Sequence, residues 1–404
     1  MLAQQSLFEE QEHEPIMRAL ESFEFAGKRT ERLEREGVPV FVNEFWTAKQ
    51  RQAHSIHEVS YRACFKPQLP SFFISRLTKP GDTVYDPFMG RGTTPIEAAL
   101  LQRNVIGNDI NPLSTYLARP RINPPSIEEI AHRLSRISWN HNGPWDTDLL
   151  AFYHPETLSE IYALRAYLLA RDALRKLDRI DDWIRMVAIN RLTGHSSGFF
   201  SVYSLPPNQA VSVAAQRKIN ERRNQVPTYR KVSDVILKKT RSLYADGRKT
   251  LSVHAQFCSE PAHNTPEIPT GAVDLVVTSP PFLDVVQYAS DNWLRTWFAG
   301  LDGRSVDISM HRKPDQWTEF VRSTFVELGR VVRSGGHVAF EVGEVRNATI
   351  ELESLVLRAI GGLPFRAKAI VINVQEFTKT ANCWGVRNNK KGTNTNRIVL
   401  VERQ

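Results

Sequence analysis

Residues 84–94, VYDPFMGRGTT, constrain the fold more than any other stretch. Val84 begins a short apolar run, Gly90 and Gly92 follow in a turn, and a helix-compatible segment leads into Pro95. Hydroxyl residues directly before a proline are typical of a helix start. Glycine allows backbone angles closed to other residues and lets a ligand approach the backbone closely. The stretch therefore predicts a strand, a turn and a helix that together form a cofactor cradle.

A second strand follows the cradle helix. Residues 104–110 have strand character and end near Asp109 and Ile110, about twenty residues beyond the glycine turn. An acid at this position in a doubly wound sheet accepts hydrogen bonds from a ribose. A helix cap or turn is the alternative role for Asp109, because Asn111 and Pro112 follow it. The pattern predicts the first half of a doubly wound α/β sheet.

The alternation of strands and helices resumes after residue 250. Two closely spaced strands at the C-terminus predict an antiparallel hairpin at the sheet edge. We expect α/β architecture, with a mostly parallel sheet and a largely helical insertion at 121–250. The expected strands are 252–257, 272–277, 335–343, 367–374 and 397–402, and the expected helices are 66–77, 315–332 and 350–360.

The insertion combines helical periodicity with a run of basic residues. A solvated helix face is the ordinary explanation of such a run. Its one-sided charge and the preceding aromatic loop, 194–208, instead favour contact with a nucleic acid. The candidate nucleic-acid-binding residues are Arg217, Lys218, Arg222, Arg223, Arg230 and Lys231, together with Lys390 in a polar loop near the C-terminus.

Composition narrows the class of protein. Lysine and arginine number 52 against 44 acidic residues, a net charge of +8 that favours polyanionic partners. The three cysteines are far apart, which argues against a disulfide framework or a zinc site, so we expect no metal. The N-terminus is polar, and no apolar run approaches the ~20 residues that cross a membrane. We expect a cytoplasmic protein that makes no use of membranes.

The second motif lies at residues 279–282. Ligands of open α/β sheets bind beyond the carboxyl ends of strands, so this turn should face the cradle across one crevice. Pro280 and Pro281 fix the backbone and remove two N–H donors. An exocyclic amine that donates to Ser279 Oγ and the Pro280 carbonyl becomes tetrahedral, and its lone pair can attack a methyl group while Phe282 stacks on the base. A plain proline turn is the alternative.

Taken together, the two motifs resemble those of the S-adenosylmethionine-dependent amino-methyltransferases of DNA. That family carries D-P-F-x-G-x-G-T-T and [S/D/N]-P-P-[Y/F/W], and the T-S-P-P form here is similar to its cytosine-N4 branch. The resemblance implies a Rossmann-like methyltransferase fold. It implies that Ser279, Pro280, Pro281 and Phe282 are catalytic, and that the cofactor-binding residues are Lys66, Asp86, Pro87, Phe88, Gly90, Gly92, Thr93, Thr94, Asp109, Ile110 and Gln256.

The resemblance also implies which part of the cofactor these residues contact. The cradle residues from Asp86 to Gly92 line the methionine side, and Asp109 takes the ribose. Thr93 and Thr94 lie at a helix N-terminus suited to the cofactor carboxylate, and the segment around Lys66 contacts the same end. Gln256 stands where the family usually has an acid that meets the adenine.

Residues 1–40 are charged and helix-compatible, which predicts a solvated helical N-terminal arm, with packing against a partner or DNA as the alternative. The catalytic part is expected at 41–120 and 251–404, and the resemblance implies a target-recognition region at 121–250.

The function implied is site-specific methylation of DNA. S-adenosyl-L-methionine would donate a methyl group to the exocyclic amine of a flipped base, cytosine N4 ahead of adenine N6. The expected setting is a restriction-modification or phage-defence system with its partner proteins. The alternatives are an RNA (rRNA or tRNA) amino-methyltransferase and a catalytically silent nucleic-acid-binding subunit. A nicotinamide dehydrogenase is least supported, since no strand carries the three-glycine phosphate fingerprint.

Overall fold

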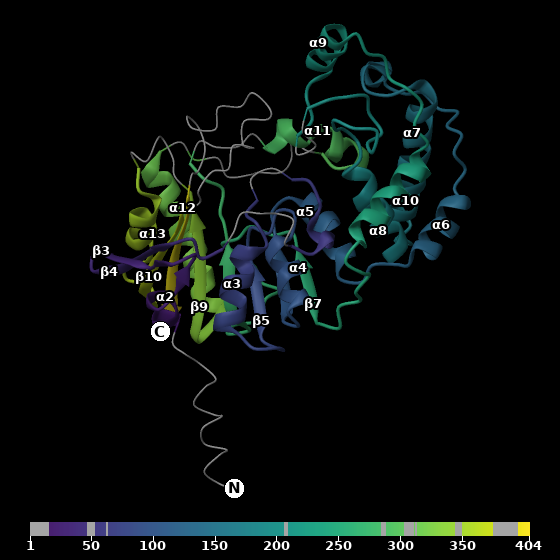
Figure 1. Ribbon diagram of the computed structural model, residues 1–404. Coiled ribbons are helices and arrows are strands. Elements are labelled where there is room, and N and C mark those ends of the chain that lie inside the picture. Colours follow the sequence, from purple (N-terminus) through teal and green to yellow (C-terminus); the bar gives the residue numbers. More distant parts are fainter. Residues whose placement is uncertain are drawn as a thin grey trace.

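A nine-stranded mixed sheet forms the centre of the molecule (Figure 1). The computed structural model describes residues 16–46, 53–61, 64–205, 209–283, 288–302, 311, 313–343, 350–374 and 395–404. The sheet order is β3-β4-β10-β11-β9-β8-β5-β6-β7. These strands are β3 (Glu31–Arg35), β4 (Val38–Asn43), β5 (Thr83–Asp86), β6 (Asn104–Asn108), β7 (Ala255–Cys258), β8 (Val273–Thr278), β9 (Val332–Val342), β10 (Phe365–Val374) and β11 (Thr395–Arg403).

The strand directions confirm the predicted doubly wound sheet. Strands β7, β6, β5, β8 and β9 are parallel neighbours. The chain runs outward from β5 to β7 and then returns to the other side of β5 as β8 and β9, so the order reverses between β5 and β8. In open α/β sheets such a reversal opens a ligand crevice at the carboxyl ends of the strands. The two motifs follow β5 and β8, the strands on either side of this point.

The C-terminal hairpin is antiparallel as predicted, but it does not form the sheet edge. β11 lies between β9 and β10 and is antiparallel to both. β10 then pairs in parallel with β4, and β3 is the outermost strand. Residues from the N-terminus therefore cover the edge that the sequence assigned to the hairpin.

The prediction of a helical arm at 1–40 is wrong beyond α2 (Ile16–Glu21). After it come two short strands, β1 (Glu24–Phe25) and β2 (Lys28–Arg29), and then β3 and β4. Strand β3 is exposed and charged, and its strand conformation depends on antiparallel pairing with β4. Strand β4 is anchored in the core by the buried side chains of Val40 and Phe41. Cross-strand pairing thus outweighs the helical preference of residues 31–36. Residues 1–15 lie outside the described part.

Helices cover both faces of the sheet. On one face lie α3 (Gln68–Leu77), α4 (Thr93–Leu100) and α5 (Pro112–Ala118), and on the other lie α12 (Pro314–Val331) and α13 (Leu352–Ile360). The side chains of β8 contribute alternately to the two faces of the sheet. Leu275 and Val277 join the core of the first face, whereas Val276 joins that of the second. Alternation along a strand that is buried on both sides produces this three-layer arrangement.

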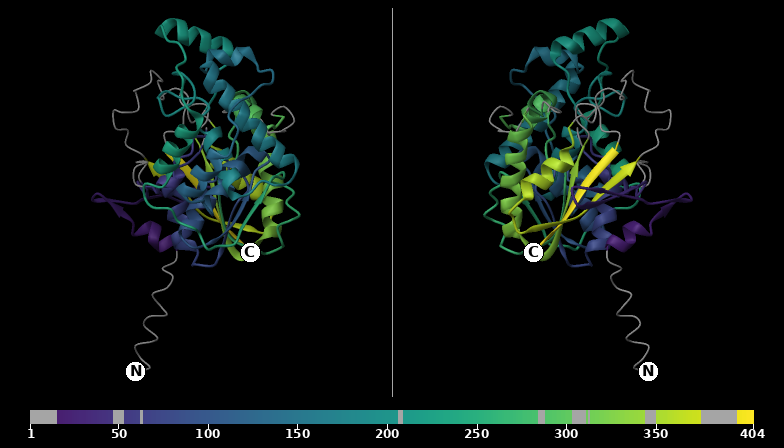
Figure 2. Two further views of the ribbon diagram at one scale, coloured as in Figure 1. Left: turned by 90° about the vertical axis from the view of Figure 1, so that its right-hand side faces the viewer. Right: turned by 90° about the vertical axis from the view of Figure 1, so that its left-hand side faces the viewer.

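The insertion is helical, as predicted. It extends from the β7 side of the sheet to above the carboxyl ends of the parallel strands (Figures 1 and 2). Among the described residues, no helix is both long and apolar enough to cross a membrane. The insertion contains the short 3-10 helices η3 (Arg119–Arg121) and η4 (Thr147–Ala151), and α6 (Ile127–Ser135), α7 (Pro155–Ala173), α8 (Arg179–Ile189), α9 (Val213–Arg223) and α10 (Val232–Leu243).

One helix crosses the expected boundary of the catalytic part. α11 (Tyr288–Ala299) follows the second motif in sequence, yet it packs against the insertion. Trp293 Nε1 donates to the Val211 carbonyl at 3.2 Å, and Arg165 Nε donates to the Trp297 carbonyl at 2.8 Å. The helix that follows the second motif in sequence is therefore tied to the helical insertion.

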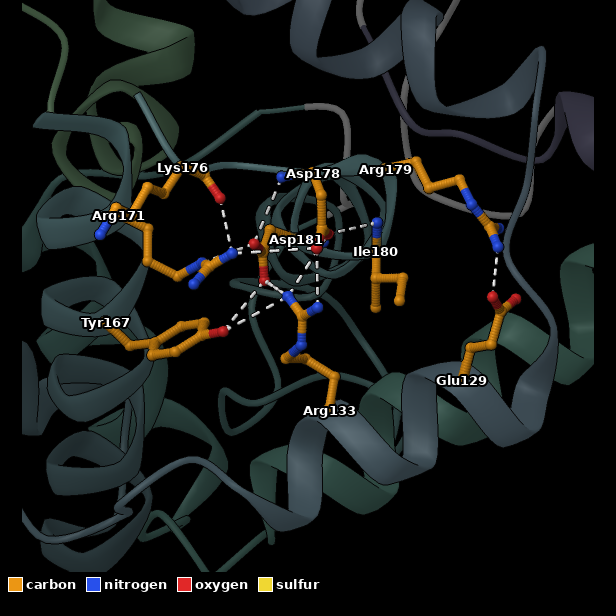
Figure 3. A network of polar contacts seen from close by, with 9 residues as sticks. All are labelled: Glu129, Arg133, Tyr167, Arg171, Lys176, Asp178, Arg179, Ile180 and Asp181. Atoms are coloured by element: carbon orange, nitrogen blue, oxygen red, sulfur yellow. Dashed lines mark hydrogen bonds and ion pairs between the residues drawn. The ribbon is translucent and has the colours of Figure 1, made fainter. Parts of the chain in front are cut away.

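A buried polar network joins three helices of the insertion (Figure 3). Asp181 on α8 is fully buried and accepts hydrogen bonds from Arg133 of α6 and from Arg171 Nε of α7, the latter at 2.7 Å. The hydroxyl of Tyr167 donates to the same carboxylate at 3.1 Å. Asp178 caps α8 and also pairs with Arg133, at 2.7 Å. A buried charge that is paired on several sides fixes the relative positions of these helices.

Candidate active site

The two motif turns line one cavity of about 190 Å³. It lies at the carboxyl ends of β5, β6 and β8, where the strand order reverses. Eleven of the residues predicted from the sequence line it: Asp86, Pro87, Phe88, Gly90, Thr93, Asp109, Ile110, Ser279, Pro280, Pro281 and Phe282. The fold thus brings together motifs that are almost two hundred residues apart in the chain.

In the cradle turn, the two glycines are required for different reasons. Gly90 has a φ of +50° and lines the cavity, and a Cβ there would meet only ordinary contacts with Cys64 and Tyr61 at 3.5–3.6 Å. Gly92 has a φ of +79° and caps α4, and its Cβ would lie 2.6 Å from Ala118 Cβ. Gly90 therefore leaves room on the cavity side, whereas Gly92 allows α4 and α5 to pack closely.

The Asp109 carboxylate fixes the cradle from the end of β6. Its Oδ2 accepts from the Gly90 N–H at 2.9 Å, and its Oδ1 accepts from the Asn111 N–H at 2.9 Å. Burial raises the pKa of Asp109, and these backbone donors oppose that rise. A cavity-facing carboxylate with its position fixed can accept further hydrogen bonds from a ligand hydroxyl.

A second carboxylate links the two turns. Asp86 Oδ1 accepts from the Thr278 hydroxyl at 2.6 Å and from the Phe88 N–H at 3.0 Å. Burial raises the pKa of Asp86 to about 7, although these hydrogen bonds favour the charged form. Thr94, which does not line the cavity, donates to the Val277 carbonyl at 3.0 Å. The cradle and the start of the catalytic turn are thus held together directly.

A hydrogen bond from α12 holds the catalytic turn in place. Trp317, buried on α12, donates its indole N–H to the Pro281 carbonyl at 2.9 Å. No described residue donates to the Pro280 carbonyl. Ser279 is only partly buried, and its side chain lies near the buried carboxylate of Glu341 on β9, whose pKa it lowers. The turn therefore presents a hydroxyl, an accepting carbonyl and the Phe282 ring to one cavity, as a reacting amine would need.

Several cavity residues were not predicted from the sequence. Phe320 on α12 packs against Phe88 with ring centroids 5.7 Å apart, and His311 packs on Phe320 at 5.0 Å. The segment after β7 and the one before α3 complete the lining. These further lining residues are Tyr61, Cys64, Phe65, Met89, Asn111, Pro261, Ala262 and His263. Phe65, Met89 and Asn111 directly adjoin predicted residues, so sequence reasoning could have found them.

Three other predicted cofactor residues do not line the cavity. Gln256 lies two residues before the end of β7, and its amide is 3.4 Å from the Glu267 carbonyl. The chain reaches the cavity only beyond Cys258, so Gln256 is too early in the strand. Lys66 is mostly buried outside the lining, and burial lowers the pKa of its ammonium group. Gly92 acts through packing, as described above.

The predicted basic residues that the structure describes separate into three groups. Arg230 points inward and donates to the Phe199 carbonyl at 2.8 Å and the Ser196 carbonyl at 3.1 Å. Lys218 and Arg222, both on α9, are exposed and form no ion pair with a described residue.

The remaining basic residues already have partners. Arg217 pairs with Asp148 at 2.6 Å, Lys231 pairs with Asp234 at 3.7 Å, and Arg223 stacks on Tyr203 at 3.7 Å. Lys390 lies outside the described residues.

Comparison with known proteins supports the resemblance. Residues 9–118 match the sequence model of a family described as DNA methylase. The resemblance to DNA methylases is confirmed. The type II methyltransferase M.BsoBI of Geobacillus stearothermophilus is 24% identical over 302 residues, which are 67% of this chain and 58% of that protein. M.MjaII of Methanocaldococcus jannaschii is 34% identical over 82 residues, 20% of this chain and 15% of that protein.

The chain thus covers less than two thirds of either relative. Among solved structures, a geranyl diphosphate methyltransferase in complex with SAM aligns over 84% of this chain and 86% of its own. The TM-score is 0.33 and the identity is 10%, so this likeness carries no argument about substrate.

Proposed function

We propose that the protein is a DNA methyltransferase that transfers a methyl group from S-adenosyl-L-methionine to an exocyclic amine, cytosine N4 ahead of adenine N6. The observation that carries the proposal is the shared cavity: the cradle and the Ser279–Phe282 turn line it together, and Asp86 connects them through Thr278. The family match supports the cofactor and the reaction class. The preference for cytosine rests on the T-S-P-P form of the motif.

The residues of the cradle fit this cofactor. Asp109 can accept hydrogen bonds from ribose hydroxyls, because its carboxylate faces the cavity and is fixed by two backbone N–H groups. Gly90 leaves its side of the cavity open. When bound, S-adenosyl-L-methionine supplies an electrophilic methyl group on a sulfonium.

At the second turn the target amine donates to Ser279 Oγ and to the Pro280 carbonyl, while Phe282 stacks on the base. These contacts make the amine nitrogen tetrahedral and direct its lone pair toward the methyl group. Positioning of this kind supplies much of the rate without a covalent intermediate. The target base reaches the cavity by flipping out of the duplex.

We further propose that the insertion at 121–250 contacts the DNA around the target. Lys218 and Arg222 on α9 are exposed cations in the part of the insertion that extends above the carboxyl ends of the strands (Figure 1). Phosphate contacts of this kind give binding that weakens with salt. Partners from a restriction or defence system belong to the same proposal.

The proposal is tested with purified protein, labelled cofactor, and duplex DNA and RNA in parallel. We expect label in DNA for the wild type. Transfer should fall at least ~100-fold in Ser279→Ala and Phe282→Ala, because each removes a contact made at the reacting centre. Cofactor binding should be retained in both variants. Label confined to RNA, or full activity in both variants, would overturn the proposal.

A further inference from the structure

Glu341 is a buried acid beside the catalytic turn. It follows Phe340 on β9, and Phe340 pairs with Thr278 of β8 in parallel register. This register places Glu341 level with Ser279. Only 3% of Glu341 is exposed, and the Ser279 side chain is close enough to its carboxylate to lower the pKa of that acid. Asn396 Nδ2 donates to its Oε1 at 2.9 Å.

No described lysine, arginine or histidine pairs with Glu341. The buried acid Glu353 differs, because it pairs with Arg397 at 2.6 Å and also with Arg35. Burial raises the pKa of Glu341, and the neighbouring Ser279 and Asn396 side chains oppose that rise without cancelling it. A buried carboxylate without a cation costs stability. Such a group next to a turn that lines the cavity is a candidate for a functional role.

We propose that Glu341 orients the Ser279 hydroxyl and, through it, accepts the proton that the methylated amine loses. This inference rests on the proposed function. In this arrangement the Ser279 hydroxyl donates its own hydrogen to Glu341, so the lone pairs of Oγ remain available for the target amine. Glu341 thus acts as a positioning residue for the catalytic turn as well as the final proton acceptor.

The step balances as follows. The amine lone pair forms the new N–C bond, the S–C bond of the sulfonium breaks, and its electron pair stays on sulfur as a neutral thioether. The nitrogen then carries a positive charge and one proton too many. That proton passes to Ser279 Oγ as the hydroxyl proton of Ser279 passes to Glu341. The carboxylate becomes a neutral acid, and water that replaces the product takes the proton back through Ser279.

The test compares Glu341→Gln with Glu402→Gln. The amide is nearly isosteric and can still accept from Ser279, but it cannot take up the proton. Glu402 lies on β11 opposite His337, at the middle of β9, and pairs with Lys368 outside the cavity. Single-turnover transfer to duplex DNA should fall about 100-fold in Glu341→Gln, within the range of general acid–base effects. The Kd values for cofactor and DNA should stay within about twofold, and Glu402→Gln should match the wild type.

A double variant separates action through Ser279 from a general structural effect. In a Ser279→Ala background, adding Glu341→Gln should cost less than about threefold, because the relay is already broken. Additive losses would overturn the inference, as would an unchanged rate in Glu341→Gln or a loss confined to KM.

If the Gln variant does not fold, Glu341→Asp replaces it. Its shorter carboxylate should slow transfer about tenfold with unchanged cofactor binding, and an unchanged rate would again overturn the inference. An inactive wild type would refute the proposed function itself, whereas an active wild type with a fully active Glu341→Gln would refute only the relay.

Discussion

Alanine substitution at Gly92 tests whether the cradle glycines have different roles. The change forces an L-residue to a φ of +79° and places a Cβ 2.6 Å from Ala118 Cβ and 3.3 Å from its Cα. The left-handed conformation costs roughly 1–2 kcal/mol. Overpacking against the α5 backbone adds about 1–3 kcal/mol, since helix atoms cannot move aside as a flexible side chain does. We expect Gly92→Ala to lower the free energy of unfolding by about 2–5 kcal/mol.

Gly81 provides the matched control. It has a φ of +91°, and a Cβ there would meet nothing within 4 Å. Gly81→Ala should therefore show only the conformational cost, about 1–2 kcal/mol. Urea unfolding followed by circular dichroism measures both variants. If Gly92→Ala were no more destabilising than Gly81→Ala, the argument that α4 and α5 require this close approach would be refuted.

Gly90→Ala should weaken cofactor binding and have little effect on stability. Its Cβ would make only ordinary contacts at 3.5 Å and beyond, so stability should fall by no more than the conformational cost. Because Gly90 lines the cavity, the methyl group occupies space for the cofactor, and the Kd should rise at least tenfold, about 1.4 kcal/mol. Calorimetric titration with cofactor measures this, and an unchanged Kd would exclude Gly90 from the binding surface.

Three further predictions concern other parts of the molecule. In the folded protein the pKa of Asp86 is about 7, above the usual value for an aspartate. The stability that this group contributes should therefore be lost as the pH rises from about 4 to 7. Denaturation at pH 5 and at pH 7.5 should show a smaller loss of stability with rising pH in Asp86→Asn than in the wild type. Trp317→Phe leaves the partly buried Pro281 carbonyl without its donor, so urea unfolding should show a loss of about 1–3 kcal/mol, with a lower kcat. Arg222→Glu should weaken DNA binding and reduce its salt dependence, as measured by fluorescence anisotropy. Arg230→Glu should chiefly lower stability, because the Arg230 guanidinium donates to the Phe199 carbonyl inside the insertion.

The sequence predicted the centre of the fold because its signals are local. The strand, glycine turn and helix at β5 and α4 are adjacent in the chain, and Asp109 directly follows β6. The Ser279–Phe282 turn alone could have been a plain proline turn, and it was recognisable because it occurs together with the cradle motif. Since parallel strands end at the same edge of a sheet, the positions of the two motifs in the chain were enough to place both at one crevice.

What could not be predicted depends on distant partners. β3 is exposed and charged, and only its pairing with β4 makes it a strand. Arg230 belongs to a basic run in sequence, yet it turns toward carbonyls from residues 196–201. Phe320 and Tyr61 reach the cavity from a helix and a loop without a motif of their own. Gln256 was assigned to the end of a strand that continues two residues further.

The most direct test of the central claim is the identity of the methylated base. Duplex DNA is incubated with the protein and labelled S-adenosyl-L-methionine, digested to nucleosides, and separated by chromatography against standards. The arrangement of Ser279, Pro280 and Phe282 around one cavity, in the T-S-P-P form of the motif, predicts that the label elutes as N4-methylcytosine. Label in N6-methyladenine would contradict the preference for cytosine, and label in 5-methylcytosine or in no base would contradict amino-methylation at this turn.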